Sequence, residues 1–133
     1  MKIALVNTLY YPYQIGGAEK CVQLLAEGLV QEGHDAFVIT LDKPEESLKQ
    51  DIVNGVRVYR TPLRSIYWPF DDSKKKPNVA FRAIWHYLDR YNKKMGNMVY
   101  EILRQERPDI VHTHNLVGFS VSAWDAAKSL GLP

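Results

Sequence analysis

Cysteine is almost absent from this sequence, because Cys21 is the single thiol in 133 residues. One thiol excludes a disulfide framework within the chain and favours a reducing compartment. Cys21 falls on the apolar side of a predicted helix, where a free cysteine behaves as a small hydrophobic residue. We therefore expect Cys21 to be buried and inert rather than a nucleophile.

Long apolar runs are absent as well. No segment approaches the roughly 20 residues that a membrane-spanning helix needs. The N-terminal apolar run is short, aromatic residues follow it and no small-residue cleavage site appears, so it does not resemble a signal peptide. Hydrophobic residues still make up 46% of the chain, enough for the core of one globular domain. These features predict a cytoplasmic protein that is bound at most to a membrane surface.

Short apolar runs alternate with segments of helical periodicity along the chain. The polar segment 43–54 shows neither pattern and is expected to be a loop. A single helix over 78–106 would be about 43 Å long at 1.5 Å per residue, so we expect a break near Gly96 and Asn97. In chain order, the predicted elements are strand 2–7, helix 18–32, strand 35–42, strand 55–62, helix 78–106, strand 109–115 and helix 119–130.

Helices placed between buried strands predict an α/β fold, a Rossmann-like parallel sheet with right-handed crossovers and flanking helices. We expect the strand order 3-2-1-4, which places the first and fourth strands beside each other at the topological switch point. The sequence stops just after a helix, where this architecture calls for another strand. Residues 1–133 are therefore expected to form a single, incomplete domain, whose open strand edge could pair two copies as a homodimer.

Two adjacent glycines, Gly16 and Gly17, directly precede the first predicted helix. Glycine lets an anion approach the unpaired N–H groups at a helix N-terminus, so the pair could form a phosphate cradle. The pair could equally provide a turn that requires positive φ, and the residues alone do not separate these alternatives. The dinucleotide-binding fingerprint needs three spaced glycines, which this loop lacks, although Asp42 at the end of the second strand could bind a ribose.

The segment VHTHN ends the fourth predicted strand and places His112 and His114 on one side of it. The carboxyl end of such a strand faces the crevice where α/β folds bind ligands, on the same edge as the glycine loop. A histidine can orient a hydroxyl group or accept its proton near neutral pH. We favour that role for His114, and a hydrogen-bonded strand end for His112. The histidine pair could also hold zinc, but no third ligand is evident and no metal is expected.

Basic and aromatic residues gather in 57–94, which holds ten basic and three acidic side chains, a net charge of +7, and eight of the 15 aromatic residues. Interleaved cations and aromatic rings suit an anionic membrane surface or single-stranded nucleic acid. The remainder of the chain has a net charge of −5, which disfavours nucleic acid. Alternatively, the rings belong to the core and the lysines to a solvated loop. The candidate contacts to a membrane or another anionic partner are Lys74, Lys75, Lys76 and Trp68.

These motifs together resemble those of a known family. The segments KIALVNTLYYP, GGAEKCVQLLAEGL, GH before a strand, and RPDIVHTHN followed by AAKSLGLP are similar, in order and spacing, to the N-terminal domain of family 4 glycosyltransferases. The resemblance covers nearly the whole chain, and it is least informative over 63–100, which varies between members. It implies a retaining enzyme of the GT-B fold, in which two Rossmann-like domains face each other across a cleft.

By this resemblance, the N-terminal domain binds mainly the acceptor and the C-terminal domain, absent from this sequence, binds the nucleotide sugar. Gly16 and Gly17 would then lie against the donor diphosphate and His114 near the reacting sugar, with His112 and Asn115 as candidates on the acceptor side. The implied function is transfer of a sugar from a nucleotide-sugar donor, without a cofactor, to a glycan or lipid-linked acceptor in cell-envelope polysaccharide or glycolipid synthesis. Residues 1–133 alone are expected to be inactive. The alternatives are a non-catalytic nucleotide-binding Rossmann-like module and a membrane-surface interaction domain.

Overall fold

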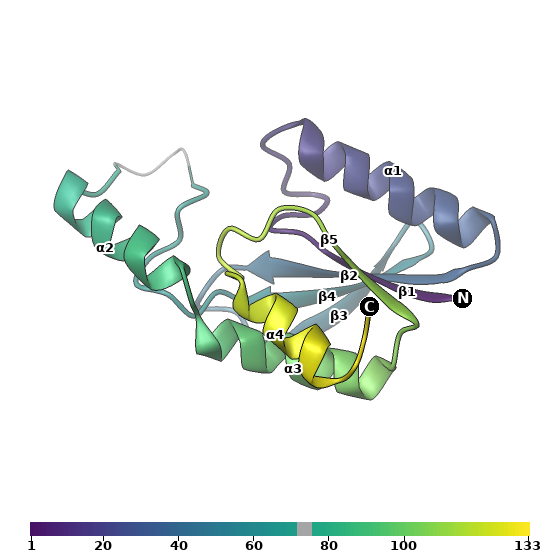
Figure 1. Ribbon diagram of the computed structural model, residues 1–133. Helices are drawn as coiled ribbons and strands as arrows, with labels where there is room; N and C mark the ends of the chain where they lie inside the picture. Colours follow the sequence, from purple (N-terminus) through teal and green to yellow (C-terminus); the bar gives the residue numbers. More distant parts are fainter. Residues whose placement is uncertain (72–75) are drawn as a thin grey trace.

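The computed structural model describes residues 1–71 and 76–133, and within them it contains one five-stranded sheet of order β3-β4-β2-β1-β5 (Figure 1). β3 is antiparallel to β4, and all other neighbouring strands are parallel. The four strands expected from the sequence are β4, β2, β1 and β5 in the predicted order. The strand bounds are β1 Lys2–Val6, β2 Asp35–Asp42, β3 Lys49–Val53, β4 Val56–Pro62 and β5 Ile110–Thr113.

The prediction of a loop over 43–54 was wrong, because β3 occupies part of that segment and forms a hairpin with β4. Four of the five β3 residues are exposed, so this edge strand has no apolar periodicity to reveal it. The sequence feature that indicates β3 is the turn between β3 and β4. Asn54 and Gly55 both have positive φ, 49° and 83°, as a two-residue hairpin turn requires.

Helices cover both faces of the sheet (Figure 1). α1 packs on one face, where Val22 and Ala26 join Leu5 and Val58 in a core. α3 and α4 pack on the opposite face over a second core that includes Val6. The helix bounds are α1 Gly17–Gln31, α2 Val79–Asp89, α3 Lys93–Glu106 and α4 Ser122–Ser129.

The helical segment 78–106 is interrupted between Asp89 and Lys93, not at Gly96 as the sequence suggested. Asn92 begins the new helix there, because its side-chain oxygen accepts the N–H of Met95 at 3.3 Å. Gly96 lies inside α3, where an added Cβ would approach the Cβ of Ser122 to 2.8 Å. The glycine therefore serves the close packing of α3 on α4 rather than a break in the helix.

The expectation that Cys21 is buried was also wrong, since its thiol is exposed on α1. The face of α1 that meets the sheet is set by Glu19, Val22, Gln23 and Ala26, and Cys21 lies outside it. Polar residues on the buried face made its position hard to recognise from hydrophobic periodicity alone.

A charged cluster around Glu106, at the end of α3, joins the helix to two strands. The carboxylate of Glu106 lies 2.7 Å from the Lys2 ammonium of β1 and 2.8 Å from the Arg57 guanidinium of β4, and it accepts a hydrogen bond from the Tyr59 hydroxyl. Arg57 also contacts Asp35 of β2 at 2.7 Å. Burial acts to raise the pKa of Glu106, but hydrogen bonds from Lys2, Tyr59 and Arg57 outweigh it and lower the pKa to about 2.

We expect Glu106→Gln to lower the free energy of unfolding at pH 7 by about 1–3 kcal/mol, because it removes a buried charged hydrogen-bond acceptor. Below its usual pKa of 4.5 Glu106 binds a proton in the unfolded state but not in the folded state. The contribution of ionised Glu106 to the free energy of unfolding is therefore complete above about pH 5 and is lost as the pH falls toward 2. Urea unfolding at pH 7 and at pH 3 measures the difference in the free energy of unfolding between wild type and variant, and we expect this difference to be smaller at pH 3.

The matched control is Glu101→Gln, on the exposed side of the same helix, where the carboxylate pairs with Arg104 at 3.1 Å. This change should alter stability little at either pH, because surface ion pairs contribute little. A Glu106→Gln protein as stable as wild type at pH 7 would show that the cluster does not hold α3 to the sheet.

Candidate functional site

Polar side chains join two loops at the carboxyl edge of the sheet. The Thr8 hydroxyl, just after β1, donates to the carbonyls of Asn115 and Val117 at 3.0 and 2.9 Å. The buried Asn7 side chain accepts the N–H of Asn115 at 3.1 Å. The loop that enters α1 and the loop that follows β5 therefore meet at the switch point between β1 and β5, where ligands bind in folds of this type.

The strand register places His114 and the N-terminus of α1 on the same face of the sheet. His112 pairs with Leu5, whose side chain belongs to the core under α1. The His114 side chain points to the same side because side chains alternate along a strand, and the two imidazole rings lie 4.3 Å apart between centroids. The glycine loop and the histidine pair therefore lie on the same face and at the same edge of the sheet.

His114 is half-buried, and its Nε2 atom is buried without a hydrogen-bond partner among the described residues. Burial lowers the pKa of His114, and the nearby His112 lowers it further. The imidazole is therefore neutral at neutral pH, and one ring nitrogen is unpaired. Such a group can orient or accept a proton from a hydroxyl group that reaches it.

Neither glycine at the start of α1 has positive φ, so a turn that needs such a conformation does not explain them. Gly16 is extended, at φ −147°, and the described glycines with positive φ lie elsewhere. A Cβ added to Gly17 would have no atom within 4 Å, which leaves open space at the helix start. The Gly16 N–H donates to the Glu19 carboxylate at 2.8 Å, whereas the first N–H groups of the helix itself, from Gly17 on, have no acceptor within it.

Arg60, which was not among the residues predicted from the sequence, holds the loop between β1 and α1 through its backbone. It is 4% exposed, donates to the Tyr11 carbonyl at 2.7 Å and pairs with Asp51 of β3 at 2.8 Å. A signal was present, since Arg60 follows Val56 and Val58 at the alternate positions that face the core. An arginine in phase with a buried face requires polar partners.

Two other candidate residues already have structural partners. Asp42 is 2% exposed and pairs with the Lys49 ammonium at 2.9 Å, so its carboxylate is not open to a ribose. The side-chain oxygen of Asn115 accepts the N–H of Val117 at 3.1 Å, which shapes the loop after β5. Asp42 ends β2 as predicted, whereas Asn115 lies in the loop after β5, two residues beyond the strand in which it was expected.

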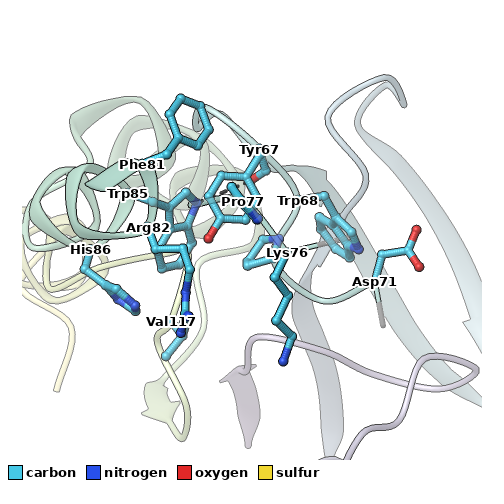
Figure 2. A pocket seen from close by; sticks show the side chains of 11 residues that line it. Tyr67, Trp68, Asp71, Lys76, Pro77, Phe81, Arg82, Trp85, His86 and Val117 are labelled. Carbon is cyan, nitrogen blue, oxygen red and sulfur yellow. Dashed lines mark hydrogen bonds between the residues drawn. The ribbon is translucent and has the colours of Figure 1, made fainter. Parts of the chain in front are cut away.

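An aromatic pocket of about 500 Å³ lies beside this edge, between α2, the segment that leads to it and the loop after β5 (Figure 2). Trp68 and Lys76 line it, together with Tyr67, Arg82 and Val117. Lys74 and Lys75, the other two lysines expected to meet an anionic partner, lie outside the described residues. Trp85 is buried, as the core alternative for the aromatic residues supposed, whereas Phe81 and Tyr91 are 40% and 55% exposed.

Comparison with known proteins identifies the family. The model of "Glycosyltransferase Family 4" matches residues 15–133. An uncharacterised 42.6 kDa protein from the cps region of Klebsiella pneumoniae is 44% identical over 96% of this chain and 34% of its own length. An uncharacterised glycosyltransferase of Methanocaldococcus jannaschii is 34% identical over 92% of the chain and 27% of its own length.

Among solved structures, sucrose-phosphate synthase from Thermosynechococcus elongatus has the same fold over 98% of this chain and 30% of its own, with a TM-score of 0.60 and 18% identity. The chain thus spans about a third or less of the length of these relatives. Because the family model covers most of its residues, this chain belongs to glycosyltransferase family 4.

Proposed function

We propose that this chain is the acceptor-side part of a retaining glycosyltransferase, which moves a sugar from a nucleotide-sugar donor to a glycan or lipid-linked acceptor in cell-envelope polysaccharide or glycolipid synthesis. The observation that carries the proposal is the open helix start at Gly17 on the same face and edge of the sheet as the unpaired ring nitrogen of His114. Because the chain spans only part of its relatives, catalysis would need the nucleotide-sugar domain as well.

Negative charge develops on the donor diphosphate as the bond between sugar and oxygen breaks. The N–H groups at the start of α1 and the positive end of its dipole favour such a charge. Gly17 leaves these groups accessible. Glu19 occupies the Gly16 N–H, so the proposed contact is with the helix N–H groups from Gly17 on.

His114 would position the incoming acceptor hydroxyl. Its pKa is lowered by burial, so the imidazole can accept a hydrogen bond from a hydroxyl group at neutral pH. His112, which is exposed beside it, would contact the acceptor without facing the reacting atoms. The contacts of Asn115 favour a supporting role, since its side chain and backbone hold the loop beyond β5.

The alternative of a non-catalytic nucleotide-binding module is less well supported. It would require the Asp42 carboxylate to bind a ribose, and that carboxylate is paired with Lys49. Pairing of two copies through the β5 edge remains a prediction. The Val111 N–H on that edge bonds the Pro133 carbonyl at 2.8 Å, which leaves less of the edge for a partner.

We expect Gly17→Val in the full-length enzyme to weaken donor binding about tenfold, equivalent to roughly 1.4 kcal/mol, because the side chain would occupy the space proposed for the diphosphate. Gly28→Val is the matched control, since Gly28 lies in the same helix with open space around its Cβ position. Calorimetric titration with the nucleotide sugar measures the difference. Equal donor affinity in the two variants would show that the diphosphate does not bind at the start of α1.

We expect His114→Ala to lower the turnover number at least tenfold while changing donor affinity much less, because the side chain is assigned to the acceptor hydroxyl. His112→Ala is the control and should affect the acceptor KM more than turnover. Since the pKa of His114 is lowered, wild-type turnover should fall only when the pH drops below about 6.5, the usual histidine value. Unchanged turnover in His114→Ala would exclude the residue from the mechanism.

A membrane-surface role for α2 is a second proposal, which would place the enzyme at the inner face of a cytoplasmic membrane. In residues 1–71 and 76–133 no helix combines the length and apolarity needed to cross a bilayer. However, Ile84 and Tyr87 on α2 and Tyr91 just after it are exposed, with exposed fractions of 52%, 71% and 55%. Lys93 and Lys94 follow directly, so apolar and cationic groups adjoin as at a lipid interface.

For this second role, we expect the protein to co-sediment with anionic phosphatidylglycerol vesicles, more strongly at low salt, and not with neutral vesicles. The double change Ile84→Ser and Tyr87→Ser should abolish binding, whereas Ile52→Ser, at an isoleucine on β3 that is more exposed than Ile84, should not. Binding that is absent at low salt, or that survives the double change, would rule out α2 as the contact.

A further inference from the structure

The aromatic pocket beside α2 has a preformed wall. Tyr67 stacks on Phe81 with 5.7 Å between ring centroids, and it lies 6.0 Å from Trp85. Trp85 is 1% exposed, and its indole N–H donates to the Tyr67 carbonyl at 3.2 Å. These contacts hold the rings of the wall in place. The faces of aromatic rings attract polarised C–H groups, such as those on one face of a pyranose ring.

Cationic side chains line the same pocket. Figure 2 shows the ends of Lys76, Arg82 and His86 on one side of the aromatic wall. Among the described residues, Arg82 and Lys76 have no carboxylate partner, in contrast to Arg57 and Arg60, which are paired. Unpaired cations around a cavity attract an anion, and a guanidinium suits a carboxylate or phosphate in particular.

Asp71 is an acidic residue that also lines the pocket. In Figure 2 it lies beyond Trp68, with its carboxylate directed away from Lys76 and Arg82. Among the described residues, the side of the pocket formed by Arg82 and Lys76 therefore carries positive charge.

The position of the pocket connects it to the edge that carries His114. Val117, three residues after His114, lines the pocket, and its carbonyl accepts the Thr8 hydroxyl at 2.9 Å. The Asp89 carboxylate at the end of α2 accepts the N–H of Gly118 at 2.9 Å, which fixes the helix against the loop after β5. A ligand in the pocket thus lies beside the loop that carries the proposed acceptor-positioning residue.

We propose that this pocket binds an acidic acceptor glycan, with a sugar ring on the face of Tyr67 and a neighbouring anionic group held by Arg82 and Lys76. This inference rests on the proposed function and names the class of its acceptor. The anion is the carboxylate of a uronic acid or the phosphate of a glycosyl phosphate, since the guanidinium binds both in the same way. A volume of about 500 Å³ lies within the range of roughly 300–1,000 Å³ that is usual for small-molecule sites.

The test measures binding to the full-length protein by calorimetry, with no donor present and no turnover required. The probes are a disaccharide that ends in glucuronic acid, its neutral glucose counterpart, glucose 1-phosphate and inorganic phosphate. We expect the acidic disaccharide to bind about tenfold more tightly than the neutral one, the gain of one hydrogen bond to a charged group. Tighter binding of glucose 1-phosphate than of the glucuronide would identify phosphate as the preferred anion.

Arg82→Gln should abolish the preference for the acidic disaccharide. Arg104→Gln, at an exposed arginine on α3, should retain it. The inference is overturned if the neutral disaccharide binds equally well, if Arg82→Gln keeps the preference, or if inorganic phosphate binds as tightly as either acidic sugar. The proposed function is tested separately, by donor affinity in Gly17→Val and by turnover in His114→Ala. Failure of the acidic-acceptor inference is therefore distinguishable from failure of the proposed function.

Discussion

The ionic cluster around Glu106 is the interaction on which the arrangement of the layers depends. It joins α3 to β1 through Lys2 and to β4 through Arg57 and Tyr59, across the strand that lies between them. A buried carboxylate is tolerated only when it is fully paired, so the helix has few alternative positions on this face. The cluster lies at the amino ends of the strands, which leaves the carboxyl ends free for a binding site.

At the carboxyl ends of the strands, hydrogen bonds between loops hold the structure together. Thr8 and Asn7 fix the loop after β1 to the loop after β5. Arg60 also holds the loop after β1, through a hydrogen bond to its backbone. Ser122 and Asn92 similarly join the start of α4 to the start of α3, since the Ser122 hydroxyl donates to the Asn92 carbonyl at 2.8 Å. These bonds give the edge a fixed shape before any ligand arrives, which reduces the entropic cost of binding.

The carboxyl edge thereby combines two kinds of surface. Near β1 and β5 it offers backbone N–H groups and a neutral imidazole, which suit a reacting phosphate and hydroxyl group. Toward α2 it offers aromatic rings and cations, which suit recognition of a larger ligand. The two proposals thus use different parts of this edge, with the strand ends for the chemistry and the pocket beside α2 for the acceptor, which agrees with function residing in sites rather than in folds.

The sequence by itself determined the four parallel strands, because apolar periodicity and strand alternation are local properties. The topology rules for α/β folds then placed these four strands in their order and set the edge where the glycines and histidines lie. The sequence missed β3, whose exposed residues leave no pattern, and placed the helix break at Gly96 instead of Asn92. Only the tertiary structure decided that Gly96 packs on Ser122, that Asp42 is paired, that Cys21 is exposed and that the aromatic block forms a pocket. Each of these depends on contacts between segments far apart in the chain, which no local pattern encodes.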